Sequence, residues 1–222
     1  MGILRGSRLV PSPRTSVAHR FGQALLAAAI VLAPMAADAA ETESHFDRQA
    51  RRTVIQYGVG FSTEVPLARG ALCPANQPCI LGAGGGIAAR LGFRARATYY
   101  LGAAYSVTKQ DSDKLYRLST LQQARAEGRY FLDSTRAVSP YAFAALGAAA
   151  YGNEWTLDTF GPLGSLGLGL TAEVTPRTLL GFSAGYRMIR FQAFNDPTGL
   201  RREASYTHMF SMDLTMEVSD VW

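Results

Sequence analysis

Small and apolar residues alternate along Ser139 to Asn153 and sort the segment onto two faces. Residues two apart share a face of an extended strand, so one face holds Tyr141, Phe143, Ala145, Gly147, Ala149 and Tyr151. The ten steps from Tyr141 to Tyr151, at about 3.3 Å each and a tilt of about 40°, cover roughly 25 Å, the height of the apolar band on an outer-membrane barrel. We therefore predict a membrane-spanning strand with a girdle tyrosine, Tyr141 and Tyr151, at each interface. A buried Ala-rich helix is the alternative, because a short apolar run fits both.

Seven further segments show the same two-faced pattern and favour strands over helices. They are Thr53 to Ser62, Ile80 to Phe93, Thr98 to Thr108, Leu118 to Leu132, Leu163 to Val174, Leu179 to Phe191 and Ser205 to Val218. In most of them bulky apolar residues oppose glycine, serine or charged residues, as on a strand between lipid and a filled lumen. The pattern predicts an all-β fold, an eight-stranded antiparallel up-and-down transmembrane barrel.

The predicted connections alternate between long and short. The longer ones are Thr63 to Cys79, Lys109 to Arg117, Asn153 to Pro162 and Gln192 to Ala204. The shorter ones are Arg94 to Ala97, Asp133 to Ser139 and Thr175 to Thr178. Bacterial outer-membrane barrels have short periplasmic turns and longer external loops. We therefore expect both termini in the periplasm and the long loops outside the cell.

The beginning of the 222-residue chain has the features of a secretory signal. Four arginines precede an apolar core from Ala24 to Ala33, and Ala37-Asp38-Ala39 fits an A-x-A cleavage site. We expect a signal peptide at residues 1–39, a short periplasmic leader at 40–52 and the barrel domain at 53–222. The signal peptide takes 4 of the 22 Lys and Arg and 1 of the 17 Asp and Glu, so 18 basic residues stand against 16 acidic ones in the remainder. This near balance gives no support to nucleic-acid binding.

The inward faces of the predicted strands carry four positively charged and four negatively charged residues. They are Arg90, Arg125, Arg129 and Arg187 against Glu127, Glu173, Asp213 and Glu217. Buried charges are stable only when they are paired and hydrogen-bonded, and an eight-stranded barrel has room for little but side chains. We expect a salt-bridge network that plugs the lumen; a gated ion path along these charges is the rival interpretation.

The two cysteines, Cys73 and Cys79, bracket a short proline-containing segment in the first long loop. An exported protein meets an oxidising compartment, so we expect a disulfide that staples this loop. A metal site would need further Cys or His ligands nearby, and the sequence offers none. No metal or cofactor is expected.

With its strand count, its loop alternation, the repeats Leu146-Gly147 and Gly185-Tyr186-Arg187 and its terminal aromatic residue Trp222, the chain resembles the OmpA/OmpX-type eight-stranded outer-membrane barrels of Gram-negative bacteria. The resemblance covers about Thr53 to Trp222. It implies outer-membrane localisation, and it implies that the barrel-assembly machinery recognises Trp222.

We expect a non-enzymatic, structural or interaction role, with an external partner that the sequence does not identify. Candidate contact groups near the outer rim, suited in part to lipopolysaccharide phosphates, are Trp155, Phe160, Lys109, Lys114, Arg117, Arg201 and Arg202; mere solvation explains the cations equally well.

Two other functions remain open. A lipid-modifying enzyme such as a lipid A deacylase would need a base, for which the barrel offers only His208, and the H-x-S-N pattern of the deacylases is absent. A soluble, lipocalin-like ligand-binding barrel would turn its apolar face inward.

Overall fold

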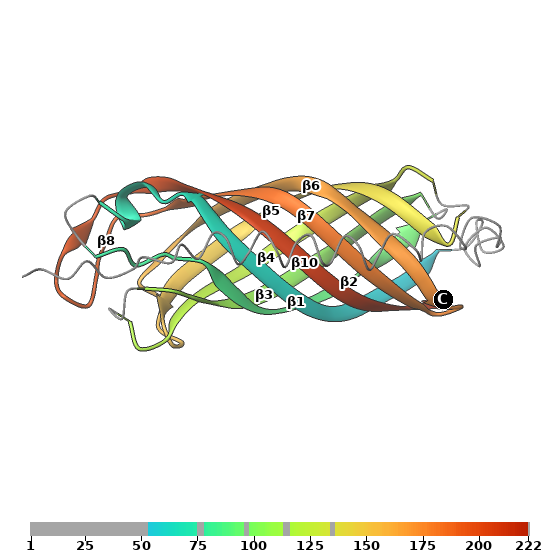
Figure 1. The fold of residues 1–222 in the computed structure, drawn as a ribbon, viewed down its shortest axis with the longest axis horizontal. Helices are drawn as coiled ribbons and strands as arrows, with labels where there is room; N and C mark the ends of the chain where they lie inside the picture. Colours follow the sequence, from blue (N-terminus) through green and yellow to red (C-terminus); the bar gives the residue numbers. More distant parts are fainter. Residues whose placement is uncertain (1–52, 75–77, 96–97, 113–115, 134–135, 222) are drawn as a thin grey trace, which may run out of the picture. The chain divides into compact units, whose positions relative to one another are not determined.

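The computed structural model describes residues 53–74, 78–95, 98–112, 116–133 and 136–221, which form a closed barrel (Figure 1). Its strands are β1 (Val54–Ala68), β2 (Gly84–Ala95), β3 (Tyr99–Gln110), β4 (Ser119–Phe131), β5 (Val138–Asn153), β6 (Thr159–Thr175), β7 (Thr178–Phe191) and β10 (Ser205–Val221). Around the barrel they follow the order β1-β10-β7-β6-β5-β4-β3-β2, and every neighbouring pair is antiparallel. The predicted fold is confirmed. The expected signal peptide, leader, cleavage site and Trp222 lie outside the described residues.

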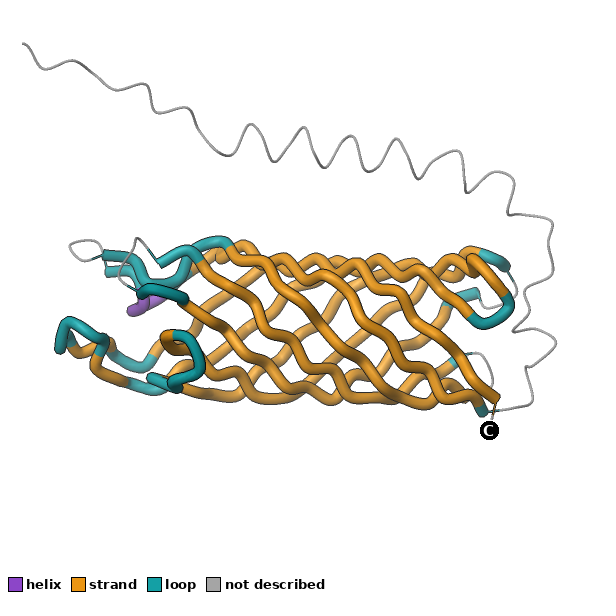
Figure 2. Tube along the Cα trace, turned by 90° about the horizontal axis from the view of Figure 1, so that it is seen from below, coloured by secondary structure: helices purple, strands orange, loops and turns teal. Residues whose placement is uncertain are grey.

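The connections gather at the two ends of the cylinder (Figure 2). One end, called the loop end here, holds the connections between β1 and β2, β3 and β4, β5 and β6, and β7 and β10. The short 3-10 helix η2 (Gly70–Leu72) lies in the first of these, and the small hairpin of β8 (Phe194–Asn195) and β9 (Arg201–Arg202) in the last. The other end, called the turn end, holds the remaining turns and the end of β10.

Two predicted connections differ from the structure. The loop expected at Asn153 to Pro162 is a turn at 154–158, because β5 and β6 pair as far as Tyr151 and Thr159. The strand expected from Ile80 begins only at Gly84. Leu81, which therefore belongs to the first loop, is fully buried. Apolar alternation continues through both regions, so the pattern alone misplaced these two boundaries.

The predicted orientation of β5 is wrong. Tyr141 and Tyr151 are 2% and 0% exposed and point into the barrel, whereas Leu146 is 74% exposed on the outside. The two tyrosines are therefore not girdle residues. Both faces of this strand are uncharged and mostly apolar, so alternation predicts a strand without deciding which face meets lipid.

Glycines on β6 and β7 explain why the rings turn inward. Tyr141 is paired directly with Gly169, and Phe143 with Gly167. A Cβ on Gly167 would lie 2.7 Å from Cε1 of Phe143, so a larger residue there would collide with the ring. Each aromatic side chain lies over the space left by a glycine in the neighbouring strand. The lumen is thereby filled at this level.

Among the described residues, no helix has the length and apolar character needed to cross a membrane.

Candidate functional site

Six buried charged residues form a central ion cluster that crosses the lumen. Its members are Arg90, Arg125, Glu127, Arg129, Asp213 and Glu217, and each side chain is at most 4% exposed. The β10 strand stands opposite β4 in the strand order. Arg129 Nη2 of β4 lies 3.0 Å from Glu217 Oε1 of β10, and Arg129 Nε lies 2.7 Å from Glu127 Oε1. The Arg129–Glu217 pair therefore reaches from one wall of the barrel to the opposite wall.

The second carboxylate of β10 completes this cluster. Asp213 Oδ2 lies 2.6 Å from Arg90 Nη2 and 3.4 Å from Arg125 Nη2, and its other oxygen accepts a 2.6 Å hydrogen bond from Ser62. Each carboxylate is thus held by more than one donor, as buried charges require. The structure brings together six of the eight residues expected in a lumen network.

Arg187 belongs to a separate outer ion cluster around Glu64, nearer the loop end. Arg187 pairs with Glu64, and both side chains are at most 1% exposed. Glu64 also accepts hydrogen bonds from Gln123 (2.5 Å), Thr108 (2.9 Å) and Gln110 (2.9 Å). The sequence analysis missed Glu64 because it placed the loop from Thr63 onward. The alternation of inward residues from Gln56 to Ser62 continues to Glu64 and could have identified it.

The structure places Glu173 outside both ion clusters. It is half-buried near the turn end of β6, where its carboxylate interacts electrostatically with Arg94. Arg94, which the sequence analysis assigned to a turn, is buried on β2 with its guanidinium carbon 3.7 Å from the ring centre of Phe131. The turn end of the lumen is therefore filled by stacked aromatic and cationic groups.

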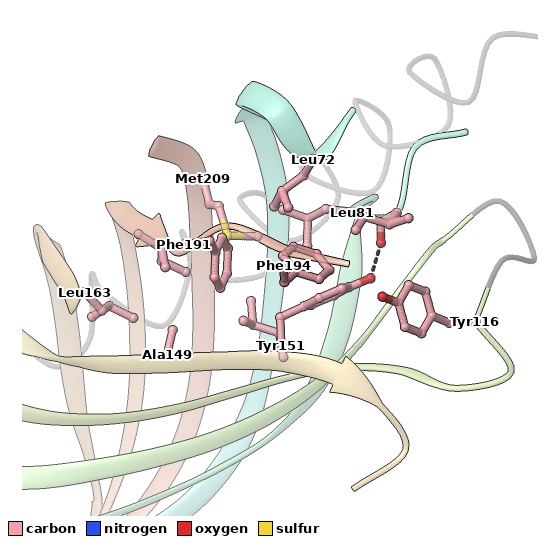
Figure 3. Packing of buried hydrophobic residues seen from close by; sticks show 12 residues of the cluster. Leu72, Leu81, Tyr116, Ala149, Tyr151, Leu163, Phe191, Phe194 and Met209 are labelled. Carbon is pink, nitrogen blue, oxygen red and sulfur yellow. Dashed lines mark hydrogen bonds between the residues drawn. The ribbon is translucent and has the colours of Figure 1, made fainter. Parts of the chain in front are cut away.

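An apolar cluster, called the outer cap, fills the loop end of the barrel (Figure 3). It consists of Leu72, Ile80, Leu81, Tyr116, Leu121, Ala149, Tyr151, Leu163, Ile189, Phe191, Phe194 and Met209. The Tyr151 hydroxyl donates to the Ile80 carbonyl and lies 2.5 Å from the Ser119 hydroxyl. Burial raises the pKa of Tyr116, which lies in the β3–β4 connection, so its hydroxyl stays neutral. The first loop is thus tied down over the lumen.

The Cys73–Cys79 disulfide is present in this loop, and Cys73 packs against the outer cap. The bridge closes the segment that leads from η2 to Ile80, and its half-buried Cys73 adds to the apolar packing. It therefore stabilises the loop that packs against the outer cap.

Arg202 joins the first loop to the β8–β9 hairpin. Its guanidinium donates to the carbonyls of Leu72 (3.3 Å) and Pro78 (3.2 Å) and pairs with Asp196 at 2.8 Å. Burial acts to raise the Asp196 pKa, but hydrogen bonds from Thr198 and Arg202 hold it below its usual range. Arg202, expected as a surface contact group, is 1% exposed and serves as an internal latch. Its position follows from the fold of two loops distant in sequence.

Some of the other expected contact groups are exposed, and others are paired with an acidic side chain on the surface. Trp155, in the β5–β6 turn, is 78% exposed, and Phe160 and Lys109 lie exposed on β6 and β3. Arg117 pairs with Glu154 at 3.4 Å, and Arg201 with Glu203 at 3.1 Å, in both cases on the surface. Lys114 lies outside the described residues.

His208 faces outward on β10 beside Tyr186 of β7. The Tyr186 hydroxyl and His208 Nδ1 are hydrogen-bonded, and the two rings stack with centroids 5.8 Å apart. Ser211, three residues further along β10, is buried and points inward. Across the described residues no group of His, Cys, Asp and Glu side chains is arranged to hold a metal ion.

The outer wall is covered by large apolar side chains on every strand. Phe61, Leu101 and Leu168 are 69%, 69% and 65% exposed on β1, β3 and β6. Charges lie inside and apolar groups outside, which is the reverse of a soluble barrel and the arrangement of a barrel in lipid. The fold is that of an eight-stranded outer-membrane barrel. The lipocalin-like alternative, which needs an apolar interior, is wrong.

Comparisons with known proteins give similar folds at low sequence identity. No family model and no curated protein matches the chain. Among solved structures, Neisserial surface protein A is 16% identical over 75% of this chain and 96% of its own, with a TM-score of 0.47. OprG from Pseudomonas aeruginosa is 10% identical over 77% and 97%, with a TM-score of 0.49. Ail of Yersinia pestis is 11% identical over 76% and 99%, with a TM-score of 0.45.

Proposed function

We propose that this chain is a non-enzymatic barrel of a Gram-negative outer membrane, with a structural or interaction role carried out at its outer face. The observation that supports this most directly is the exposed apolar belt around a charged interior. Moving such a surface from water into lipid is favourable, because it removes the apolar side chains from contact with water. The barrel wall has paired strands throughout, so no strand edge remains to be satisfied in the membrane.

We propose that the lumen is blocked by side chains and does not conduct ions. Two ion clusters and the outer cap block it at successive levels, and Arg129 and Glu217 connect opposite walls. Displacing such pairs for an ion to pass would expose buried charges, which costs several kcal/mol per unpaired ion. The rival proposal of a gated ion path has no comparable support.

The proposed orientation puts the loop end outside the cell and the turn end, with the chain termini, in the periplasm. The longer connections and the disulfide lie at the loop end, which agrees with the usual asymmetry of bacterial barrels. Outer-membrane lipids and lipopolysaccharide are then the immediate neighbours, and Trp155 and Lys109 become candidate contacts for an external partner. Assembly would proceed through the barrel-assembly machinery.

Two measurements test the proposal on the expressed full chain. Membrane fractionation should recover the protein with the outer membrane, and unheated samples should migrate differently from heated ones on a denaturing gel. Membrane insertion would be contradicted if the protein stays soluble, or if its gel mobility is the same with and without heating. Separately, the purified barrel should produce no discrete openings in planar bilayers; regular conductance steps would contradict the plug.

A further inference from the structure

The outward-facing ladder between β7 and β10 changes character toward the loop end. Its directly paired rungs are Phe182–Leu214, Ala184–Met212, Tyr186–Phe210, Met188–His208 and Arg190–Tyr206. The first three hold only apolar and aromatic side chains. Arg190 is the first permanent charge on this outer face.

The position of Arg190 matches the edge of the hydrocarbon. Leu180 lies on the same face at the turn end, and Arg190 follows it ten residue steps later along β7. At about 3.3 Å per residue and a tilt of about 40°, this is roughly 25 Å along the barrel axis, the height of the apolar band. Arg190 therefore lies at headgroup level. Its guanidinium carbon is 5.7 Å from the ring centre of Tyr206, an aromatic residue at the level where such rings concentrate.

A second arginine, Arg69, lies in the first loop next to the segment that contacts the start of β10. Ala71 N donates to Ser205 Oγ at 3.1 Å, which holds the start of η2 against the start of β10. Arg69 directly precedes η2, is exposed, and has its Nη1 3.6 Å from Cys79 Sγ. Arg69 thus lies in the segment that is held beside the start of β10, and Arg190 lies on the other neighbour of that strand, β7.

Ion pairing distinguishes these two arginines from the others at the loop end. Arg117, Arg201 and Arg202 are each paired with an acidic side chain. Within the described part of the chain, neither Arg69 nor Arg190 has such a partner. Their charge is therefore available to an external anion.

A hollow of about 430 Å³ adjoins Arg190 on its β6 side. Its lining residues are Pro162, Arg190, Phe191, Gln192, Ala193 and Ala204. The volume falls in the range of small-ligand sites, and the mixture of apolar wall, amide and guanidinium suits a sugar that carries a phosphate. The apolar rungs below offer a track for acyl chains.

We propose that Arg69 and Arg190, with Arg190 lying over the ring of Tyr206, bind the phosphate groups of an outer-leaflet glycolipid, whose sugar occupies the hollow and whose acyl chains lie along the β7–β10 ladder. This inference rests on the proposed function, because it requires the loop end to meet the outer leaflet. Arginine grips phosphate through paired N–H donors. Arg69 and Arg190 differ from the contact groups expected from the sequence.

The test uses the full chain in nanodiscs that contain either bis-phosphorylated lipid A or the same lipid with its phosphates removed. Retained lipid per barrel is counted by native mass spectrometry after transfer to detergent. We expect the phosphorylated lipid to be retained selectively. Arg190→Gln and Arg69→Gln should each reduce its retention by about tenfold, the scale of one lost charge-assisted hydrogen bond.

Arg201→Gln is the matched control, since Arg201 is exposed at the same end but paired with Glu203; it should leave retention unchanged. Equal retention of both lipids, or an equal loss in Arg201→Gln, would overturn the site. Displacement by inorganic phosphate alone would assign it to a free anion and also overturn the proposal.

The same samples separate this inference from the proposed function. A heat-dependent gel shift of the parent shows that the barrel is inserted. If it inserts but does not select the phosphorylated lipid, only the lipid site fails. If it does not insert, the proposed function fails with it.

Discussion

Replacing Glu64 with Gln should destabilise the folded barrel by about 3–5 kcal/mol, the cost of leaving one partner of a buried ion pair without its counter-charge. Arg187, its partner, has a side chain only 1% exposed and cannot reach water. Glutamine preserves the size of the side chain and can still accept from Thr108 and Gln110. The loss therefore reports the missing charge rather than a cavity.

A double-mutant cycle isolates this term. Glu64→Gln, Arg187→Gln and the double variant are unfolded by guanidinium in lipid vesicles, and the double variant should recover at least about 2 kcal/mol relative to the sum of the singles. Glu203→Gln is the control: its pair with Arg201 is exposed at 70% and 71%, so it should change the free energy of unfolding by less than about 1 kcal/mol. Strictly additive effects, or equal losses at Glu64 and Glu203, would refute the buried pair.

Three further outcomes are expected. Leu168→Arg should weaken folding into vesicles by about 2–4 kcal/mol, with Leu168→Phe nearly neutral, because residue 168 faces lipid at mid-strand; the opposite order would mean that the barrel is inside out. Thiol reagents should label Cys73 and Cys79 on intact cells only after reduction, and labelling without a reductant would disprove the bridge. The Asp196 pKa is lowered in the folded protein, so its ionised carboxylate stabilises the latch at pH values above the ordinary Asp pKa of about 3.9. This stabilisation is lost as the pH falls through the lower pKa of the folded state. Asp196→Asn should therefore open the loops to protease at pH 7, and parent and variant should converge once the pH falls below the lowered folded pKa; a difference that persists below it would contradict this.

The sequence predicted strand faces wherever the two faces differ in chemistry. On β4, the charged residues Arg125, Glu127 and Arg129 cannot face lipid, so their inward orientation follows from alternation alone. The leucines and glycines of β6 decide its orientation in the same way. On β5 both faces are uncharged and mostly apolar, and the orientation depended on space that glycines of other strands provide for Tyr141 and Phe143.

The candidate site shows the same division. Alternation identified the members of the central ion cluster but not their partners, because Arg129 and Glu217 meet only when the barrel closes. The outer cap and the Arg202 latch were not predicted, since they require the first and last loops to fold together over the lumen.

The sequence by itself therefore determined the number of strands, their antiparallel order and most of the lipid-facing surface, because period-two alternation is a local property of each strand. Only the tertiary structure decided which charges pair, which way β5 faces and how the loop end is sealed. Those features depend on contacts across a narrow lumen between segments far apart in the chain, such as Glu64 with Arg187 and Tyr151 with Ile80. A local pattern contains no information about such distances.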